Sequence, residues 1–411
     1  MSRSSKPLIA GALALLPLAA ALFATPAAAY NTLNGQAPLV IGHRGASGYL
    51  PEHTLQSYAL AIQQGANFIE PDLVMTQDGV LIARHEPMLG GTTDVASKFG
   101  AARMSTRNVD GVSTTDYFAS DFTLAEIKTL RAKQSRAGRD QSFNGLYEIP
   151  TLDEVINLAK TQSLALGRPV GIYPEVKHST FHDGVFGSKV FENALVDKLH
   201  AAYGNSGAAP VFIQSFEVGN LQYLNGKTDI RLVQLVDADN VNADGSMSLV
   251  DPYRQPYDIQ AAGGTLTFAD LLTPGGLAAI KAYADGVGPW KPYLVTTVAD
   301  GVERDGKPGL SIGDRRVDGS TGVIEAAHQA GLLVHTWTFR NDASGYGFGD
   351  PQAEMSYYMA LGVDGVFTDF PDTGVKALAA VPEPGTYALL ALGLVGVGFV
   401  ARRRKATGAG G

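Results

Sequence analysis

The feature of this sequence that most restricts its fold is a regular alternation of short apolar runs with longer amphipathic segments. Eight apolar runs rich in branched residues are typical of strands and span residues 39–42, 68–75, 171–175, 211–215, 231–236, 285–288, 332–337 and 365–368. Repeated strand–helix units form a parallel sheet, and eight of them can close into a (β/α)8 barrel. We therefore predict an α/β protein with a TIM-barrel fold.

Several segments between these runs place apolar residues three or four positions apart, which is the period of an amphipathic helix. We predict helices over residues 54–64, 151–160, 190–203, 322–329 and 353–361. Thr151 followed by Glu154 forms a capping box, which marks the start of one of these helices.

Two stretches interrupt the alternation, residues 90–148 and residues 237–268, and both are rich in polar and turn-forming residues. Each follows a predicted strand, so in a barrel both would be loops inserted on the catalytic face. We expect them to form a lid or cap.

The N-terminus has the order of a secretory signal peptide. Arg3 and Lys6 precede an apolar run over residues 8–23, and the small residues Ala27-Ala28-Ala29 follow it. We expect residues 1–29 to be removed before Tyr30, which would leave residues 30–380 as the catalytic barrel.

The C-terminus has a three-part pattern over residues 381–405, followed by a short tail, residues 406–411. A Pro-Glu-Pro triplet begins at Pro382, an apolar stretch covers residues 387–401, and Arg402-Arg403-Arg404-Lys405 closes it. At about 1.5 Å per residue the stretch is somewhat shorter than a bilayer core of about 30 Å, but flanking arginines can extend it. We predict a transmembrane helix rather than a buried C-terminal helix, with its cationic end in the cytoplasm.

This tail resembles the PEP-CTERM sorting signal of Gram-negative bacteria. The resemblance implies processing by an exosortase and export to the periplasm, the cell surface or the extracellular matrix. The apolar helix would anchor the chain in the membrane before processing.

Composition excludes several kinds of chemistry. The chain has no cysteine, so it can form neither disulfides nor a thiolate nucleophile, and any metal must have oxygen or imidazole ligands. The formal net charge is −8, and it falls to about −14 without Arg3, Lys6 and the four tail cations. So acidic a body would repel a phosphate backbone, and we expect no nucleic-acid partner.

His43-Arg44-Gly45 directly follows the first predicted strand, where barrel enzymes carry their active sites. A histidine there can transfer a proton near neutral pH, and an arginine can bind a phosphate through two parallel hydrogen bonds. Taken alone, a histidine bonded within its own loop explains the triplet equally well.

Glu70 and Asp72 lie two positions apart on the second predicted strand, so both carboxylates point to the same face. Two adjacent carboxylates in an apolar run are costly to bury unless a cation compensates them, and a divalent metal with oxygen ligands would do so. A salt-bridged pair at a strand end is the alternative. On the third strand, Glu175 is a further candidate metal ligand, and Lys177 is a candidate phosphate contact unless the two simply pair with each other.

His85 follows a short apolar segment that the turn Gln77-Asp78-Gly79 separates from the second strand. This order predicts a hairpin-like return that brings His85 over the barrel mouth, where it could act as acid or base opposite His43. The segments around Gln214, Phe216, Trp337 and Asp369 end other predicted strands, and we expect Gln214, Phe216 and Trp337 to contact the substrate.

In this order, the motifs resemble the glycerophosphodiester phosphodiesterase family, and most closely its periplasmic branch. The resemblance covers residues 39–378 and is carried by His43-Arg44-Gly45, Pro51-Glu52-His53-Thr54, Glu70-x-Asp72, Leu73-Val74-Met75-Thr76, His85, Gly171-Ile172-Tyr173-Pro174-Glu175-x-Lys177, Gln214-Ser215-Phe216, Ala284-Asp285-Gly286-Val287-Gly288 and Thr368-Asp369-Phe370-Pro371.

The resemblance implies a TIM barrel that binds one divalent cation, calcium or magnesium, and hydrolyses glycerophosphodiesters to glycerol 3-phosphate and an alcohol. It makes Glu70, Asp72 and Glu175 metal ligands, and Glu52 a contact to the metal or to the glycerol hydroxyls. It makes His43 and His85 the acid–base pair, and Arg44 and Lys177 the cations that bind the phosphate.

Two residues depart from the family pattern: His53 replaces an asparagine, and Glu86 replaces an aspartate after the second histidine. Two other functions remain alternatives. One is a related barrel phosphodiesterase or phospholipase acting on lipid headgroups, which would need apolar loops at the barrel mouth. The other is a non-catalytic barrel that binds a ligand at the cell surface, for which two histidines would be unnecessary.

Overall fold

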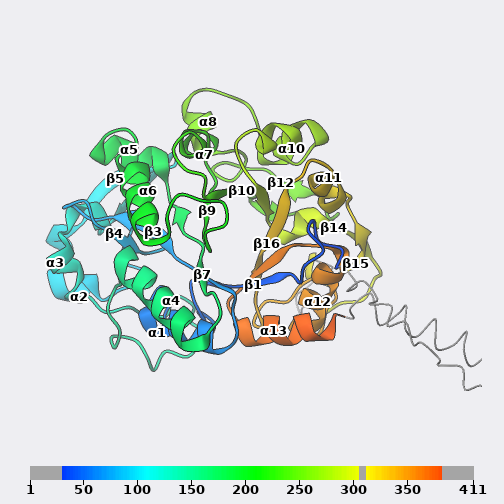
Figure 1. The fold of residues 1–411 in the computed structure, drawn as a ribbon, viewed down its shortest axis with the longest axis horizontal. Helices are drawn as coiled ribbons and strands as arrows, with labels where there is room; N and C mark the ends of the chain where they lie inside the picture. Colours follow the sequence, from blue (N-terminus) through cyan, green and yellow to red (C-terminus); the bar gives the residue numbers. More distant parts are fainter. Residues whose placement is uncertain (1–29, 305–311, 382–411) are drawn as a thin grey trace, which may run out of the picture.

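A closed barrel of parallel strands forms the centre of the computed structural model, which describes residues 30–304 and 312–381 (Figure 1). The central sheet consists of eleven strands, of which β4 (Leu81–Ala83) is antiparallel. The others are β1 (Leu39–His43), β2 (Phe68–Glu70), β3 (Asp72–Met75), β7 (Gly171–Ile172), β8 (Glu175–Val176), β9 (Phe212–Ser215), β10 (Arg231–Val236), β13 (Gly286–Pro289), β16 (Leu333–Phe339) and β17 (Gly365–Thr368).

These ten parallel strands occupy eight positions in the barrel, because β2 and β3 are parts of one strand, as are β7 and β8. The interruptions fall at Pro71 and Pro174, which have no N–H to donate to the sheet. The first strand β1 pairs with both β2 and β17, which closes the ring. The predicted TIM barrel and its eight strands are therefore confirmed.

Helices follow the strands in the order expected for a (β/α)8 barrel, and they surround it (Figure 1). They are α1 (Leu55–Gln63), α4 (Leu152–Leu166), α5 (Ser179–Phe186), α6 (Val190–Tyr203), α7 (Val218–Asn225), α10 (Pro274–Lys281), α11 (Val323–Gln329), α12 (Pro351–Leu361) and α13 (Pro371–Ala380). The five predicted helices correspond to α1, α4, α6, α11 and α12. The capping box of Thr151 and Glu154 is present at the start of α4.

The barrel interior is arranged in layers along the strands. Ile41, Phe68, Tyr173, Phe212, Val233 and Phe367 form an apolar cluster inside the sheet. Because side chains two positions apart point to the same face, the next inward-facing residues after Ile41, Phe68, Tyr173 and Phe212 are His43, Glu70, Glu175 and Gln214. The apolar layer therefore forms a floor beneath a polar layer at the carboxyl ends of the strands.

The first insertion is an ordered subdomain rather than an extended polar loop. It contains α2 (Val95–Phe99), the short helices η1 (Ala101–Arg103) and η2 (Ala119–Asp121), the hairpin β5 (Ser105–Val109) and β6 (Val112–Asp116), and α3 (Leu124–Ile127). Phe122 and Leu130 are fully buried there in a separate apolar cluster, together with Val74 of β3 and Ile82 of β4. This shared cluster fixes the insertion onto the barrel.

Two further insertions follow later strands. The one after β10 contains β11 (Asn240–Val241), β12 (Met247–Ser248), α8 (Tyr257–Ala261) and α9 (Phe268–Leu271). The one after β13 contains η3 (Lys291–Leu294), β14 (Val295–Ala299), η4 (Ile312–Asp314) and β15 (Arg315–Ser320), and the sequence analysis did not predict its antiparallel hairpin.

The predicted signal peptide and almost all of the sorting segment, including its predicted transmembrane helix, lie outside the described residues. Within residues 30–304 and 312–381, no helix combines the length and the apolar character needed to cross a bilayer.

Candidate active site

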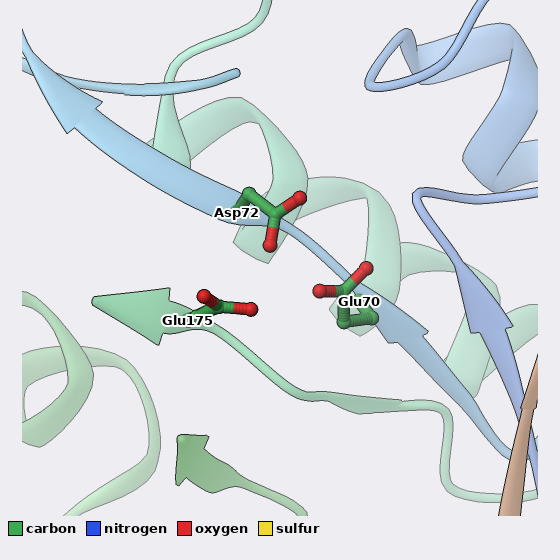
Figure 2. A group of neighbouring side chains, drawn as sticks. All are labelled: Glu70, Asp72 and Glu175. Carbon is green, nitrogen blue, oxygen red and sulfur yellow. The ribbon is translucent and has the colours of Figure 1, made fainter. Parts of the chain in front are cut away.

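Three carboxylates meet at the carboxyl ends of the second and third barrel strands (Figure 2). Glu70 ends β2, Asp72 begins β3 and Glu175 begins β8. One oxygen from each lies within 4.8 Å of the others, and all three side chains are buried. The predicted spacing of Glu70 and Asp72 does bring both carboxylates to one place, and Glu175 joins them from the neighbouring strand.

Protein contacts only partly compensate the charge of this group. The carboxylate of Glu70 accepts hydrogen bonds from the backbone N–H of Arg44 at 2.7 Å and from the Gln214 amide at 3.1 Å. Burial raises the pKa of Glu70 well above its usual range, and burial raises that of Glu175 to about 8 despite the nearby Lys177. Burial also opposes ionisation of Asp72, but the hydrogen bond from His53 and the charges of Lys177 and Arg44 together outweigh it and lower the Asp72 pKa well below its usual range.

The three residues fit a divalent cation. Asp72 Oδ1 is buried and has no hydrogen-bond partner among the described residues. Burial raises the pKa of Glu70 and Glu175 even though Lys177 lies beside Glu175, so the neighbouring cations do not fully balance these buried carboxylates. Calcium and magnesium both prefer such oxygen ligands.

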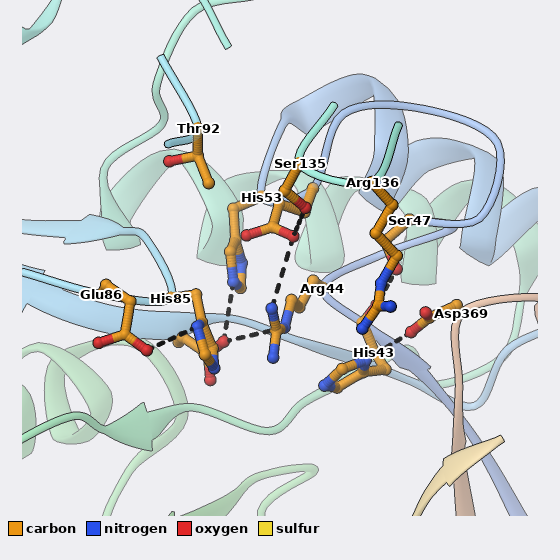
Figure 3. A network of polar contacts seen from close by, with 12 residues as sticks. His43, Arg44, Ser47, His53, His85, Glu86, Thr92, Ser135, Arg136 and Asp369 are labelled. Atoms are coloured by element: carbon orange, nitrogen blue, oxygen red, sulfur yellow. Dashed lines mark hydrogen bonds and ion pairs between the residues drawn. The ribbon is translucent and has the colours of Figure 1, made fainter. Parts of the chain in front are cut away.

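His43 lies at the end of β1 and is held by a carboxylate from the end of the last strand (Figure 3). Its Nδ1 contacts Asp369 Oδ1 at 2.5 Å, so this carboxylate does not bind the other ring nitrogen, Nε2. Burial and the neighbouring Arg44 lower the His43 pKa to about 4, although Asp369 acts in the opposite direction. At neutral pH the ring is therefore uncharged, and Nδ1–H donates to Asp369.

His85 shows the same arrangement on the other side of the three carboxylates. It follows β4, whose antiparallel pairing with β3 confirms the predicted hairpin-like return. His85 Nδ1 contacts Glu86 Oε1 at 2.9 Å, and Lys177 Nζ lies 3.4 Å from Nε2. Burial, Arg44 and Lys177 lower the His85 pKa.

Two cations lie beside the carboxylates. Arg44 Nε is 3.3 Å from Asp72 Oδ2, and Lys177 Nζ is 3.0 Å from Glu175 Oε1. Arg44 adopts a left-handed backbone conformation, with φ at 59°, which non-glycine residues rarely populate and which often occurs at functional sites. Lys177 does pair with Glu175, but its ammonium group also reaches His85, so pairing alone does not describe its position.

A cavity of about 500 Å³ opens above these groups. His43, Arg44, His85, Lys177 and Gln214 line it, with Phe216 and Trp337 among its apolar walls. The rings of Phe216 and Trp337 meet edge to face at 5.7 Å, and the Trp337 indole N–H donates to the Gly288 carbonyl at 2.8 Å. Both of the predicted insertions contribute to the walls, through Val109 to Thr114 of the first and Pro252 to Phe268 of the second.

Glu52 lies apart from the three carboxylates that could share one metal ion. Its Oε2 contacts Arg44 Nη1 at 3.4 Å and accepts a hydrogen bond from Ser135 of the first insertion at 3.0 Å. Although burial opposes ionisation, Arg44 and other nearby cations lower the Glu52 pKa to about 2. Its role as a metal or glycerol contact stays a prediction.

His53, which replaces the asparagine of the family pattern, lies between a candidate metal ligand and α1. Its Nε2–H donates to Asp72 Oδ2 at 2.9 Å, and its Nδ1 lies 2.7 Å from the Tyr58 hydroxyl. Burial lowers its pKa to about 4, so the neutral ring links Asp72 to α1.

The contacts that support His43 were not predicted from the sequence. Besides His43, the carboxylate of Asp369 binds Arg139 Nη2 at 2.5 Å and Arg340 Nε at 3.0 Å. Asp369 had a signal, because it ends the last predicted strand, but Arg139 lies far away in the first insertion. A further histidine, His335, ends no strand in the cavity but belongs to the apolar barrel floor. Its Nδ1 contacts the buried Tyr173 hydroxyl at 2.7 Å.

The fold and the position of the site define a TIM-barrel enzyme whose chemistry takes place where the strands end. A family model described as the glycerophosphoryl diester phosphodiesterase family matches residues 43–373, from the first histidine to α13. The chain therefore belongs to this family, and its enzyme class is glycerophosphodiester phosphodiesterase. The PEP-CTERM protein-sorting motif matches residues 380–405, which confirms the resemblance of the tail and indicates export.

Curated relatives agree with this assignment. A glycerophosphodiester phosphodiesterase of Arabidopsis thaliana is 36% identical over 81% of this chain and 84% of its own length. One of Haemophilus influenzae is 32% identical over 85% of this chain and 92% of its own length.

Solved structures share the fold. A putative glycerophosphoryl diester phosphodiesterase of Silicibacter pomeroyi superposes with a TM-score of 0.56 at 21% identity, over 85% of this chain and 97% of that one. A phosphodiesterase of Oleispira antarctica in complex with the product sn-glycerol-3-phosphate gives 0.50 at 19% identity, over 85% of this chain and all of that one.

Proposed function

We propose that this protein hydrolyses glycerophosphodiesters to glycerol 3-phosphate and an alcohol, with His43 and His85 as the acid–base pair and one divalent cation as cofactor. The observation that carries the proposal is that both histidines bind a carboxylate through Nδ1 while both line the cavity beside three buried carboxylates. The Oleispira antarctica structure, a complex with sn-glycerol-3-phosphate, supports the same product.

In this proposal Glu70, Asp72 and Glu175 hold the cation, calcium or magnesium, and Glu52 is the least directly supported ligand. The bound ion would supply positive charge to the non-bridging oxygens of the phosphodiester. The burial of Glu70, Asp72 and Glu175 favours this role, because three carboxylates so close together repel one another without a cation.

The chain's own residues would bind the substrate and move its protons. Arg44 and Lys177 would bind the phosphate and neutralise charge that develops in the transition state. One histidine, in its neutral form, would take the proton of the attacking oxygen at Nε2, and the other, protonated on both ring nitrogens, would donate its Nε2 proton to the leaving alkoxide. Gln214, Phe216 and Trp337 would contact the rest of the substrate.

We further propose that the enzyme acts outside the cytoplasm of a Gram-negative bacterium, in the periplasm, on the cell surface or in the extracellular matrix. The PEP-CTERM motif supports this location, together with the signal-peptide pattern of residues 1–29. An exosortase-type enzyme would process the C-terminus, and the apolar helix would hold the chain in the membrane until then.

The test is release of glycerol 3-phosphate from glycerophosphocholine by the purified protein, before and after chelation and after addition of calcium or magnesium. We expect chelation to abolish activity, one of the two ions to restore it, and His43→Ala or His85→Ala to reduce it by about 10²–10⁴-fold. His200→Ala is the matched control, since His200 lies on α6 and bonds Thr228. Wild-type rates for His43→Ala and His85→Ala would refute the acid–base assignment, and full activity in chelator would refute the cofactor.

A further inference from the structure

The hairpin β5–β6 of the first insertion ends at the barrel mouth. Its turn is the dipeptide Asp110-Gly111, and both residues have positive φ, at 48° and 85°. A two-residue turn of this kind matches the twist of the flanking strands and is favoured by Asp-Gly. The turn therefore presents the Asp110 carboxylate at a defined point on the cavity rim.

Asp110 binds a histidine that the proposed mechanism does not use. Its Oδ2 lies 2.7 Å from Nδ1 of His178, which immediately precedes α5. His178 Nε2 lies 2.9 Å from Oε2 of Glu86, whose other oxygen contacts His85 Nδ1 at 2.9 Å. A continuous chain of polar contacts thus runs from Asp110 through His178 and Glu86 to His85.

The charges along this chain favour a fixed geometry. Burial opposes protonation of His178, but the two flanking carboxylates outweigh it and raise the His178 pKa to about 10. The imidazolium therefore donates from both nitrogens at neutral pH. Burial likewise opposes ionisation of Glu86, yet the two histidines lower the Glu86 pKa well below its usual range. Each Glu86 oxygen then has one histidine partner, so the carboxylate cannot rotate without breaking a charged hydrogen bond.

Apolar packing fixes the hairpin in the same position. Val109 at the end of β5 and Phe118 just after β6 are buried with Phe181 of α5. The rings of Phe118 and Phe181 stack with centroids 5.8 Å apart. The hairpin and α5, which carry the two ends of the Asp110–His178 contact, therefore form one packed unit.

We propose that Asp110 and His178 are positioning residues, which orient the Glu86 carboxylate and through it the His85 ring, so that Nε2 faces the cavity. The inference rests on the proposed function of His85. It assigns the inserted hairpin a part in the reaction beyond forming a wall, because His85 has this orientation only when the hairpin is seated. An outer-shell residue of this kind typically contributes about 10–100-fold to activity.

The first test is steady-state kinetics of Asp110→Ala and His178→Ala with glycerophosphocholine. We expect kcat to fall by about 10–100-fold while KM changes by less than about threefold, because neither residue is assigned to phosphate binding. Asp110→Asn, which keeps an acceptor oxygen, should retain more activity than Asp110→Ala. Thr115→Ala is the control, because Thr115 lies on the same hairpin and its exposed hydroxyl bonds Thr106 of the neighbouring strand. Wild-type kcat for His178→Ala would overturn the inference.

Two measurements separate this inference from the function on which it rests. Proton NMR should show a downfield Nδ1–H signal of His85. His178→Ala should shift or broaden this signal, even though its direct partner, Glu86, is unchanged in that variant. In the His85→Ala background, His178→Ala should cause no further loss of kcat. An unchanged Nδ1–H signal in folded His178→Ala would overturn the inference even if residual activity were undetectable. A fully active His85→Ala enzyme would instead refute the proposed function.

Discussion

Replacing Asp369 with asparagine tests whether the carboxylate beneath His43 is required for proton transfer. Asp369 is buried and contacts His43, Arg139 and Arg340, and its charge keeps the proton of the neutral ring on Nδ1. Asparagine has nearly the same shape, but its amide group can donate to Nδ1. In that case the ring proton would move to Nε2, and His43 could no longer accept a proton from the cavity side.

The expected loss follows from the contribution of a positioned acid–base group, about 10²–10⁴-fold in rate. At 1.36 kcal/mol per tenfold change, this corresponds to about 3–5 kcal/mol of transition-state stabilisation. We expect Asp369→Asn to lower kcat within this range and to change KM little, because Asp369 lies behind His43 and does not line the cavity.

The assay is glycerophosphocholine hydrolysis in saturating calcium or magnesium, at a temperature where circular dichroism shows the variant folded. Asp372→Asn provides a matched control on α13, since Asp372 pairs with the exposed Lys376 and with Tyr49. It should lower kcat by no more than about twofold, as expected for a surface change. If folded Asp369→Asn kept more than about a tenth of the wild-type kcat, the Asp369 carboxylate would not be what sets the tautomer of His43.

Three further outcomes are expected. Lys291→Met removes the cation of a buried ion pair, in which Nζ lies 2.6 Å from Glu354 Oε1. The free energy of unfolding in urea should fall by about 3–5 kcal/mol, and adding Glu354→Met should restore most of it. The folded-state pKa of His178, about 10, lies above the ordinary value of 6.5. Its contribution to stability is therefore complete below about pH 6.5 and is lost as the pH rises through about 10. The stability difference between wild type and His178→Gln should shrink over that interval, and a constant difference would contradict the pKa. Gly45→Ala would place a Cβ 2.5 Å from a serine hydroxyl of α1 at a φ of 87°. Thermal unfolding should show a loss of about 2–4 kcal/mol from overpacking and backbone strain together. Gly79→Ala, at a φ of 79° with open space around it, should show the backbone cost alone.

Local sequence patterns were enough to predict the strands and the residues at their ends. Glu70 and Asp72 follow the period of two within one run, and that run remains a single barrel strand although Pro71 interrupts it. His43 and Glu175 were found in the same way, because in a parallel barrel a residue at a strand's carboxyl end faces the active site wherever it lies in the chain.

Contacts between segments that are distant in the sequence could not be predicted from local sequence patterns. Arg139 reaches Asp369 across 230 positions of sequence, and Asp110 reaches His178 from a hairpin whose strands are largely polar and exposed. Neither pair has a spacing that any local rule connects. The first insertion was read as a polar loop for a related reason, since its buried residues, such as Phe122, are scattered among polar ones and assemble only in three dimensions.

The cavity is lined both by barrel-strand residues and by residues of the insertions, and we expect these two groups to tolerate substitution to different degrees. The groups proposed to act on the phosphate lie on or directly beside barrel strands, whereas Val112 and Tyr253, which also line the cavity, belong to the two insertions. Exchanging the second insertion for that of a relative should therefore alter which alcohols are accepted while leaving the three buried carboxylates in place. The first insertion is less interchangeable, because Arg139 and Asp110 connect it to both histidines. Substitutions that change the specificity for the alcohol, whether natural or engineered, should therefore be better tolerated in the second insertion than in the first.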